Sequence, residues 1–212
     1  MRIAILSWGS LIETGVERGL EIDGGWHTGG PVLPLEFSRI SQSGERAGCL
    51  TLVIDERNGV NVPTHYAISS NTNLNRAIVN MMNVERITLT HSIAYVNLLN
   101  DTERLFARRK HPIACNTIKA WARSNGFDAV VWTGLLANFE EISGIPFSIE
   151  TAIQHLSHLR EPTSSRAYEY IHNAPPEVVT PLRRIVDDME PSTPIGSGGP
   201  LSFHFRTLPQ HQ

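Results

Sequence analysis

Ser10 is the first side chain in this sequence with a setting suited to chemistry. It follows Gly9 in the segment Trp8-Gly9-Ser10-Leu11, where an apolar run that begins near the N-terminus stops abruptly. A glycine-serine corner at the end of a buried strand can point successive backbone N–H groups outward, and such a nest binds an anionic group. The corner is therefore interpreted either as an ordinary turn or as an anion-binding loop. A serine nucleophile served by a distant histidine is a further alternative, which no local feature supports.

Glu85 is a second candidate, because it stands at the end of a predicted amphipathic helix. Apolar residues recur at i, i+3, i+4, i+7 and i+8 over about residues 72–85, namely Leu74, Ala77, Ile78, Met81 and Met82. Asn71 or Thr72 is expected to cap the start of this helix. A carboxyl at its end can be partly buried with a pKa raised toward neutrality, which suits a general base. The alternative is a solvated helix end, since Arg86 follows directly.

Glu36 and Arg39 form a third candidate pair in the predicted strand 31–41. Strand alternation places Glu36 and Ser38 on the face opposite Leu35 and Phe37, so the acid is expected on a wet face or at the mouth of a barrel. Arg39 can pair with Glu36 in a structural ion pair, or it can bind a substrate carboxylate.

Metal and cofactor chemistry find little support in the sequence. Cys49 and Cys115 lie far apart with no CxxC or CxxH partner, which argues against a zinc site and against a disulfide framework. The nine histidines are scattered, and although His155 and His158 share a helix face, no carboxylate motif completes a ligand set. We expect neither a metal nor a cofactor.

Charge and hydrophobicity argue against nucleic-acid-binding, membrane-spanning and secreted classes of protein. The formal charge of −3 is nearly neutral, and the basic residues are dispersed apart from Arg108-Arg109-Lys110 and Arg183-Arg184, so a nucleic-acid partner is not favoured. The sequence contains no apolar run long enough for a membrane span, and its N-terminal apolar stretch lacks the pattern of a signal peptide. We expect a cytoplasmic protein with a small-molecule partner, with a homodimer as an open alternative.

The remaining patterns predict the elements that must position these residues. Strands are expected at 2–8, 31–41, 47–55, 61–69, 92–99 and 127–136, a mobile glycine-rich loop at 24–31, a charged loop at 100–111, and a helix around 114–122 that ends at 124–126. The three strands between 31 and 69 predict a consecutive antiparallel meander, in which Pro34 and Pro63 mark edges or bulges.

Beyond about residue 145 the pattern is helical, with Thr180 and Pro181 as the expected cap and first-turn proline of the last helix. The segment 191–212 is rich in Pro, Gly and Ser and is expected to be loose or packed along a surface, with "LSFHFR" as a candidate for a short added strand. The predicted organisation is a domain over 1–140, a helical extension over 141–190 packed on it, and a tail over 191–212.

The order of these features resembles the gamma-glutamylcyclotransferase-like family and is similar to a bacterial branch of it. The resemblance covers about residues 1–100 and rests on the Trp8–Leu11 corner after the first strand, the strands that follow, the amphipathic helix, and Glu85 before a returning strand. In that family the corner reads Tyr-Gly-Ser-Asn or Tyr-Gly-Ser-Leu. This chain has tryptophan in place of the tyrosine, and Arg86 follows the glutamate where a glycine is common. The implied fold is α+β, a small mixed β-barrel or sheet with a C-terminal helical extension.

The resemblance also implies a reaction of the transferase or lyase type. Trp8, Gly9, Ser10, Leu11 and Arg39 would bind the substrate, with the corner holding its carboxylate end. Glu85 would take a proton from the substrate's α-amine, which attacks its own γ-carbonyl, and would return the proton to the leaving amine. The products would be 5-oxoproline and a free amine or amino acid. The competing interpretation is a binding or regulatory module that keeps the pocket without the chemistry.

Overall fold

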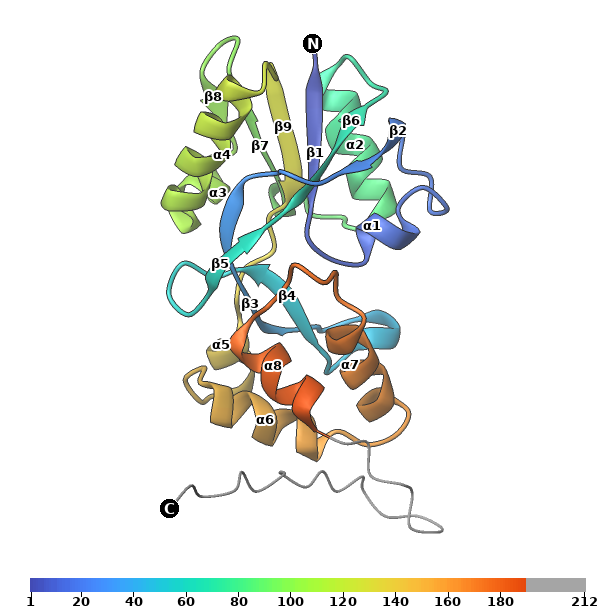
Figure 1. Ribbon diagram of the computed structural model, residues 1–212, viewed down its shortest axis with the longest axis vertical. Coiled ribbons are helices and arrows are strands. Elements are labelled where there is room, and N and C mark those ends of the chain that lie inside the picture. Colours follow the sequence, from blue (N-terminus) through green and yellow to red (C-terminus); the bar gives the residue numbers. More distant parts are fainter. Residues whose placement is uncertain (190–212) are drawn as a thin grey trace, which may run out of the picture.

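A computed structural model describes residues 1–189 of the 212-residue chain, and they form a mixed α+β fold with two β-sheets (Figure 1). The six-stranded sheet has the spatial order β2 (Ile22–His27), β6 (His65–Ser69), β1 (Ile3–Ser7), β9 (Ala129–Thr133), β7 (Ile93–Asn97) and β8 (Thr102–Glu103). The three-stranded sheet has the order β4 (Leu50–Ile54), β3 (Val32–Ile40) and β5 (Val60–Pro63). Mixed α+β structure is thus confirmed, but the described residues form no closed barrel.

Strand β1 lies in the middle of the larger sheet and is buried on both faces. It pairs in parallel with β9 and antiparallel with β6. Ile3 and Ile5 pack in the cluster that contains helix α2 (Leu74–Val84), whereas Ala4 and Leu6 pack in the cluster that contains α4 (Pro112–Ser124). Because helices cover both faces, residues 3–6 of the strand form an uninterrupted apolar run. Figure 1 shows the sheet standing between these two helices.

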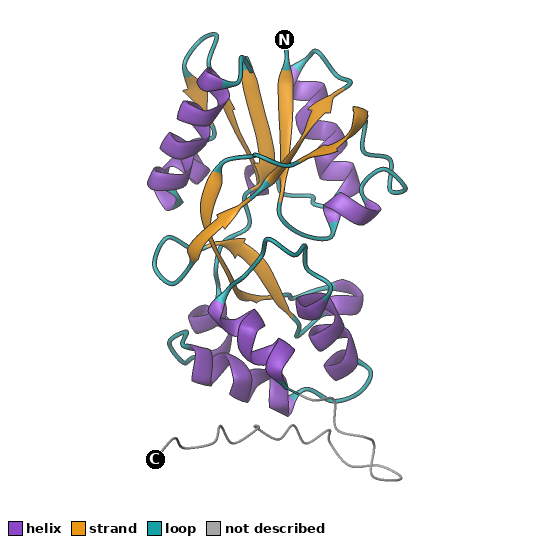
Figure 2. Cartoon of the chain, viewed as in Figure 1, coloured by secondary structure: helices purple, strands orange, loops and turns teal. Residues whose placement is uncertain are grey.

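The smaller sheet is covered by the C-terminal helices, as Figure 2 shows. These helices are α5 (Phe139–Ser143), α6 (Ile149–His158), α7 (Thr163–His172) and α8 (Pro181–Asp188). Leu35 and Phe37 of β3 share one core cluster with Leu156, Ile171 and Leu182 of these helices. The same cluster includes Ala4 and Leu6 of β1, so a single apolar core runs from the first sheet into the second.

Four short elements complete the described chain. They are α1 (Leu11–Thr14), the 3₁₀ turns η1 (Gly44–Arg46) and η2 (Thr90–Ser92), and α3 (Leu105–Lys110). Helix α1 follows the end of β1 almost directly, and η1 lies in the connection from β3 to β4. Residues of both elements line the same cavity.

The helices α2 and α8 follow the sequence-based predictions. The helix expected over 72–85 is confirmed as α2, although its cap is Asn73, whose side chain accepts a hydrogen bond from the Arg76 amide at 3.2 Å, and not Asn71 or Thr72. At α8 the prediction is confirmed in detail, because Thr180 accepts a hydrogen bond from the Arg183 amide and Pro181 occupies the first turn.

Several strand predictions were wrong. The segment 24–31, expected to be a mobile loop, contributes to β2, an edge strand that tolerates its two glycines because it packs little. The strand expected over 61–69 divides at Thr64, since β5 pairs with β3 and β6 with β1. Strand β3 lies between β4 and β5, so the three do not form a consecutive meander. The segment 100–111 contains β8 and α3.

Helix lengths and the state of the two cysteines were also compared with the sequence-based predictions. Within residues 1–189, no helix combines the length and the apolar character that a membrane crossing needs. Cys49 and Cys115 are both buried free thiols. The predicted short strand "LSFHFR" lies outside the described residues.

Candidate functional site

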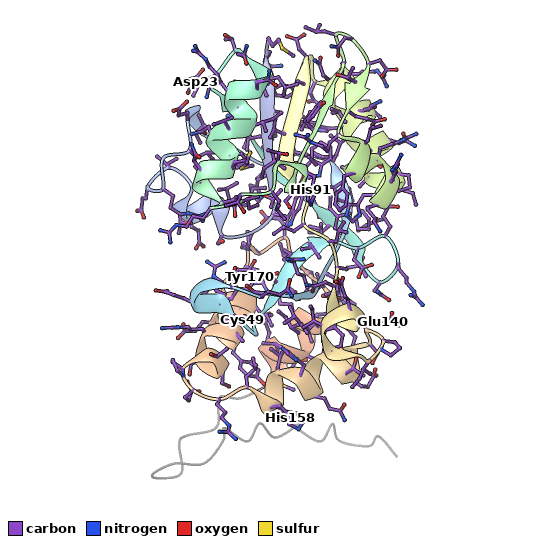
Figure 3. The ribbon with its side chains drawn as sticks, turned by 180° about the vertical axis from the view of Figure 1, so that it is seen from behind. Asp23, Cys49, His91, Glu140, His158 and Tyr170 are labelled. Carbon is purple, nitrogen blue, oxygen red and sulfur yellow. The ribbon has the colours of Figure 1, made fainter. Side chains whose placement is uncertain are left out.

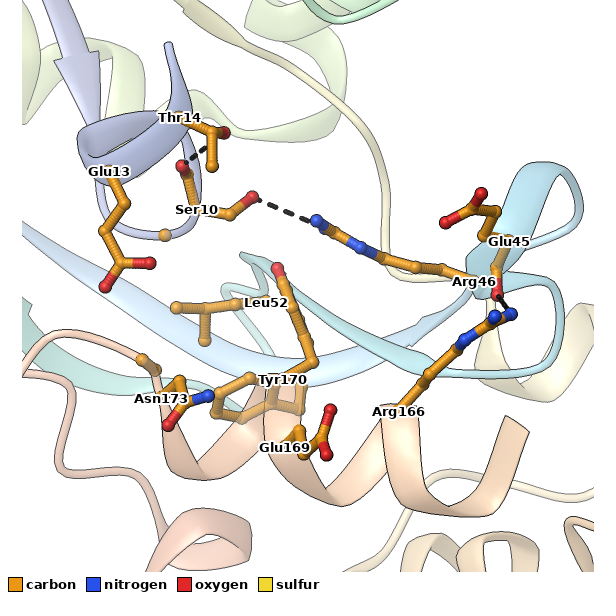
Figure 4. A pocket seen from close by; sticks show the side chains of 13 residues that line it. Ser10, Glu13, Thr14, Glu45, Arg46, Leu52, Arg166, Glu169, Tyr170 and Asn173 are labelled. Carbon is orange, nitrogen blue, oxygen red and sulfur yellow. Dashed lines mark hydrogen bonds between the residues drawn. The ribbon is translucent and has the colours of Figure 1, made fainter. Parts of the chain in front are cut away.

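A cavity of about 290 Å³ opens where the end of β1 faces helix α7, and Figure 4 shows the side chains around it. One wall consists of Gly9 and Ser10, which follow β1, and of Glu13 and Thr14 in α1. The chain turns here because Gly9 accepts a hydrogen bond from the Ile12 amide at 3.0 Å. The Thr14 hydroxyl donates to the Ser10 carbonyl at 2.9 Å, which fixes the corner. The predicted glycine-serine corner therefore does line a cavity.

The opposite wall is one face of α7, which sequence reasoning missed. Arg166, Glu169, Tyr170 and Asn173 line the cavity, and they stand at i, i+3, i+4 and i+7. That spacing places all four on the same side of a helix. A search for apolar stripes passes over this face because most of its members are polar. The signal that could have found it is the helical spacing of the polar residues themselves.

Arg46 of η1 connects the two walls. Its Nη1 donates to Ser10 Oγ at 3.3 Å, and its guanidinium carbon lies 4.7 Å from the centre of the Tyr170 ring. Arg166 donates from Nη1 to the backbone carbonyl of Glu45 at 3.2 Å, which ties α7 to the same turn. Figure 4 shows Arg46 reaching across from η1 toward Ser10.

Within residues 1–189, the charged residues that line the cavity form no ion pairs with one another. Arginines and glutamates both line it, namely Glu13, Glu45, Arg46, Arg166 and Glu169. Within residues 1–189 none of these five takes part in an ion pair. A small space with unpaired charges of both signs suits a small ligand that itself carries both signs.

Trp8 and Leu11 were predicted to contact substrate, but neither lines the cavity. Trp8 is only 6% exposed, and its indole Nε1 donates to the Leu52 carbonyl at 3.3 Å. Because Leu52 lines the cavity, the indole of Trp8 contacts the backbone of a lining residue without lining the cavity itself. Leu11 is 5% exposed and packs in the core cluster of α2.

Glu85 stands at the C-terminal cap of α2 and is not among the residues that line the cavity. Its Oε2 is 3.8 Å from Nη2 of Arg18, and Arg18 also donates to Thr14 Oγ1 at 3.4 Å and to the Val84 carbonyl. Glu85 is thus connected to the Ser10 wall through Arg18 and Thr14. Burial raises the pKa of the Glu85 carboxyl, while the charges of Arg18 and Arg46 act in the opposite direction.

Arg39 is not brought to this cavity. Its Nη1 donates to the Leu136 carbonyl at 2.9 Å, and burial lowers the pKa of its guanidinium. It makes no ion pair with Glu36. Within the described chain, Arg39 holds the connection between β9 and α5.

Glu36 and Ser38 are fully buried, which corrects the expectation of a wet face or barrel mouth. The reason is that β3 is the central strand of its sheet and that helices cover it. The Phe37 amide donates to Glu36 Oε1 at 2.8 Å, and burial raises the pKa of the Glu36 carboxyl. Neither residue lines the cavity.

The histidine pair on α6 is occupied by backbone contacts. His155 Nε2 lies 2.7 Å from the Gly48 carbonyl, and His158 Nδ1 lies 2.6 Å from the Gln154 carbonyl. Across residues 1–189, no group of three His, Cys, Asp or Glu side chains has an arrangement that could hold a metal ion.

Comparisons of the chain with family models, with curated proteins and with solved structures found no match.

Proposed function

We propose that this protein cyclises a γ-glutamyl substrate, releasing 5-oxoproline and an amine or amino acid, with Glu85 as general acid and base. One observation carries the proposal. Glu85 has a raised pKa and is connected through Arg18 and Thr14 to the corner at Ser10, beside a cavity lined by unpaired charges of both signs. A γ-glutamyl group bears an α-carboxylate and an α-amino group, so its charges complement those of the cavity.

The reaction would proceed by attack within the substrate. The Ser10 hydroxyl and Arg46, which are 3.3 Å apart, would hold the α-carboxylate. Glu85 would accept a proton from the α-amine as its nitrogen bonds to the γ-carbon, and the proton would pass to the leaving nitrogen as the γ-carbon–nitrogen bond breaks. The raised pKa makes the Glu85 carboxylate a stronger base than an exposed glutamate. Attack within one bound molecule gains further rate from orientation alone.

We also propose a fold type and a cellular compartment for this protein. The first strand, the corner at Ser10, helix α2 and Glu85 follow one another as in the gamma-glutamylcyclotransferase-like type, and this order supports assigning the chain to that type. Because the described residues form no closed barrel, the likeness lies in the order of elements. The buried free thiols Cys49 and Cys115 suit a reducing compartment, and we place the reaction in the cytoplasm.

The direct test is release of 5-oxoproline from γ-glutamyl amino acids by the full chain and by Glu85→Gln. The variant keeps the size of the side chain and loses its basicity. We expect kcat to fall by about 10² to 10⁴-fold, the usual contribution of a general base. The thermal midpoint should stay within a few degrees of the wild type. Full activity in Glu85→Gln would show that another group transfers the proton.

A non-catalytic binding module is the second candidate, favoured by the ion pair between Arg18 and Glu85 at 3.8 Å. An arginine at that distance can keep the carboxylate in a structural role. In that case γ-glutamyl compounds or 5-oxoproline would raise the thermal midpoint of the protein, while no 5-oxoproline would be released. Measurable release from a saturating substrate would exclude the module.

A further inference from the structure

Tyr170 occupies a fixed position in the cavity, opposite the corner at Gly9. Figure 3 labels it on α7, below the six-stranded sheet as drawn there. A Cβ atom added to Gly9 would lie 3.6 Å from the Tyr170 hydroxyl oxygen, so the phenol points at the backbone where β1 ends. The edge of the ring meets Phe37 at a centroid distance of 6.1 Å and an interplanar angle of 89°. Such an edge-to-face contact restricts the rotation of both rings.

Burial favours a protonated Tyr170 phenol. Burial raises its pKa, and the nearby charge of Glu85 raises it too, while Arg46 and the Leu52 backbone act in the opposite direction. The guanidinium of Arg46 lies over the ring face at 4.7 Å and holds the ring in place by a cation–π contact. A phenol that stays protonated at neutral pH is a hydrogen-bond donor and not a base.

We propose that Tyr170 is a catalytic residue that donates a hydrogen bond to the γ-carbonyl oxygen of the substrate, and this rests on the proposed cyclisation. Arg46 contacts both Ser10 Oγ and the Tyr170 ring, so a substrate whose carboxylate is held by Ser10 and Arg46 would lie against the phenol. The donor comes from the helical extension and not from the first strand, where the indole of Trp8 is turned into the core.

The proton and electron balance of the step involves no transfer from Tyr170. As the α-amine nitrogen bonds to the γ-carbon, the carbonyl π-electrons move to oxygen, and the hydrogen bond from the phenol shortens against the developing negative charge. Glu85 carries the amine proton to the leaving nitrogen, the carbon–nitrogen bond breaks, and the carbonyl re-forms. Removal of one such donor typically costs about 10² to 10³-fold in rate.

The kinetic test compares Tyr170→Phe with the wild type on γ-glutamylglycine. We expect kcat to fall about 10² to 10³-fold with a much smaller change in KM, because the hydrogen bond is strongest in the transition state. Tyr168→Phe is the matched control, since it removes a phenol from the same helix outside the cavity, and it should keep the wild-type kcat. An active wild type with an unchanged kcat in Tyr170→Phe would overturn the assignment.

A spectroscopic test separates this inference from the proposed function. γ-Glutamylglycine carrying ¹³C at the γ-carbonyl would be bound to Glu85→Gln, with and without Tyr170→Phe, and its carbonyl stretch followed by infrared difference spectroscopy. We expect a shift to lower frequency that Tyr170→Phe removes. If this shift is seen but the wild type shows no turnover, the proposed cyclisation is wrong, whereas the hydrogen bond from Tyr170 to the γ-carbonyl oxygen is supported. A carbonyl band that Tyr170→Phe does not move, or no binding at all, would overturn the inference.

Discussion

At the scale of single residues, His111 shows how burial tunes a titratable group away from the cavity. It is 5% exposed, and within the described chain neither ring nitrogen has a hydrogen-bond partner. Burial lowers its pKa from 6.5 to about 4, with Asp55 opposing this effect and Lys110 adding to it. The unfolded chain therefore binds a proton more readily than the folded protein. The resulting stability is present above pH 6.5 and is lost as the pH falls toward about 4.

His111→Leu should remove this loss. We expect the substitution to change the free energy of unfolding little at pH 7. Between pH 7 and pH 4, the free energy of unfolding of the variant should rise relative to that of the wild type by about 3 kcal/mol. Urea denaturation at the two pH values measures this difference. Exposed His158 supplies the control, because His158→Leu should follow the wild type at both. A His111→Leu variant that loses stability in acid as steeply as the wild type would show that the buried imidazole is not the cause.

At the scale of elements, the junction of β2 and β3 depends on a close backbone approach at Gly30. A Cβ atom at Gly30 would lie 2.6 Å from the Thr64 hydroxyl and 2.7 Å from the Thr64 carbonyl oxygen. The Gly30 amide also donates to that carbonyl at 2.9 Å, so the two segments cannot separate without losing a hydrogen bond. Thr64 is the point at which the chain passes from one sheet to the other.

Gly30→Ala is therefore expected to lower the free energy of unfolding by about 1 to 3 kcal/mol, the usual cost of overpacking against a backbone. Gly25→Ala is the control, since a Cβ there would meet no atom within 4 Å. Urea denaturation of both variants measures the difference. Equal stability of the two would contradict the tight junction between the sheets.

The elements also show which parts of the fold the sequence can specify. Helix α2 was predictable because five apolar side chains repeat at helical spacing, and α8 because Thr180 and Pro181 mark its start. The division of 61–69 at Thr64 was not, since nothing local says that Val62 will pair with Leu33 while Ala67 pairs with Ile5. Pairing partners distant in the chain are set by tertiary packing, which a single pattern does not encode.

At the scale of the whole molecule, the cavity exists only because two sheets and their helices meet. Its walls come from segments around residues 9–14, 45–46 and 166–173, which the fold brings together from across the chain. Gly9 and Ser10 were predicted from their place after a strand. The helical spacing of Arg166, Glu169, Tyr170 and Asn173 indicates that they share one face of a helix, but it does not indicate that this face meets the end of β1, because that depends on how the smaller sheet orients α7. Arg39 was misplaced for the same reason, since its guanidinium donates to the Leu136 carbonyl in the connection from β9 to α5.

In the proposed reaction the substrate lies in this cavity with its α-amine at Glu85. A crystal structure of Glu85→Gln with γ-glutamylglycine tests this placement, because the variant should bind the substrate and turn it over about 10² to 10⁴-fold more slowly than the wild type. We predict ligand density between Ser10 and Tyr170, the α-carboxylate at Ser10 and Arg46, and the α-amine within hydrogen-bonding distance of the side chain at position 85. A ligand bound elsewhere, or an α-amine that turns away from position 85, would contradict this claim.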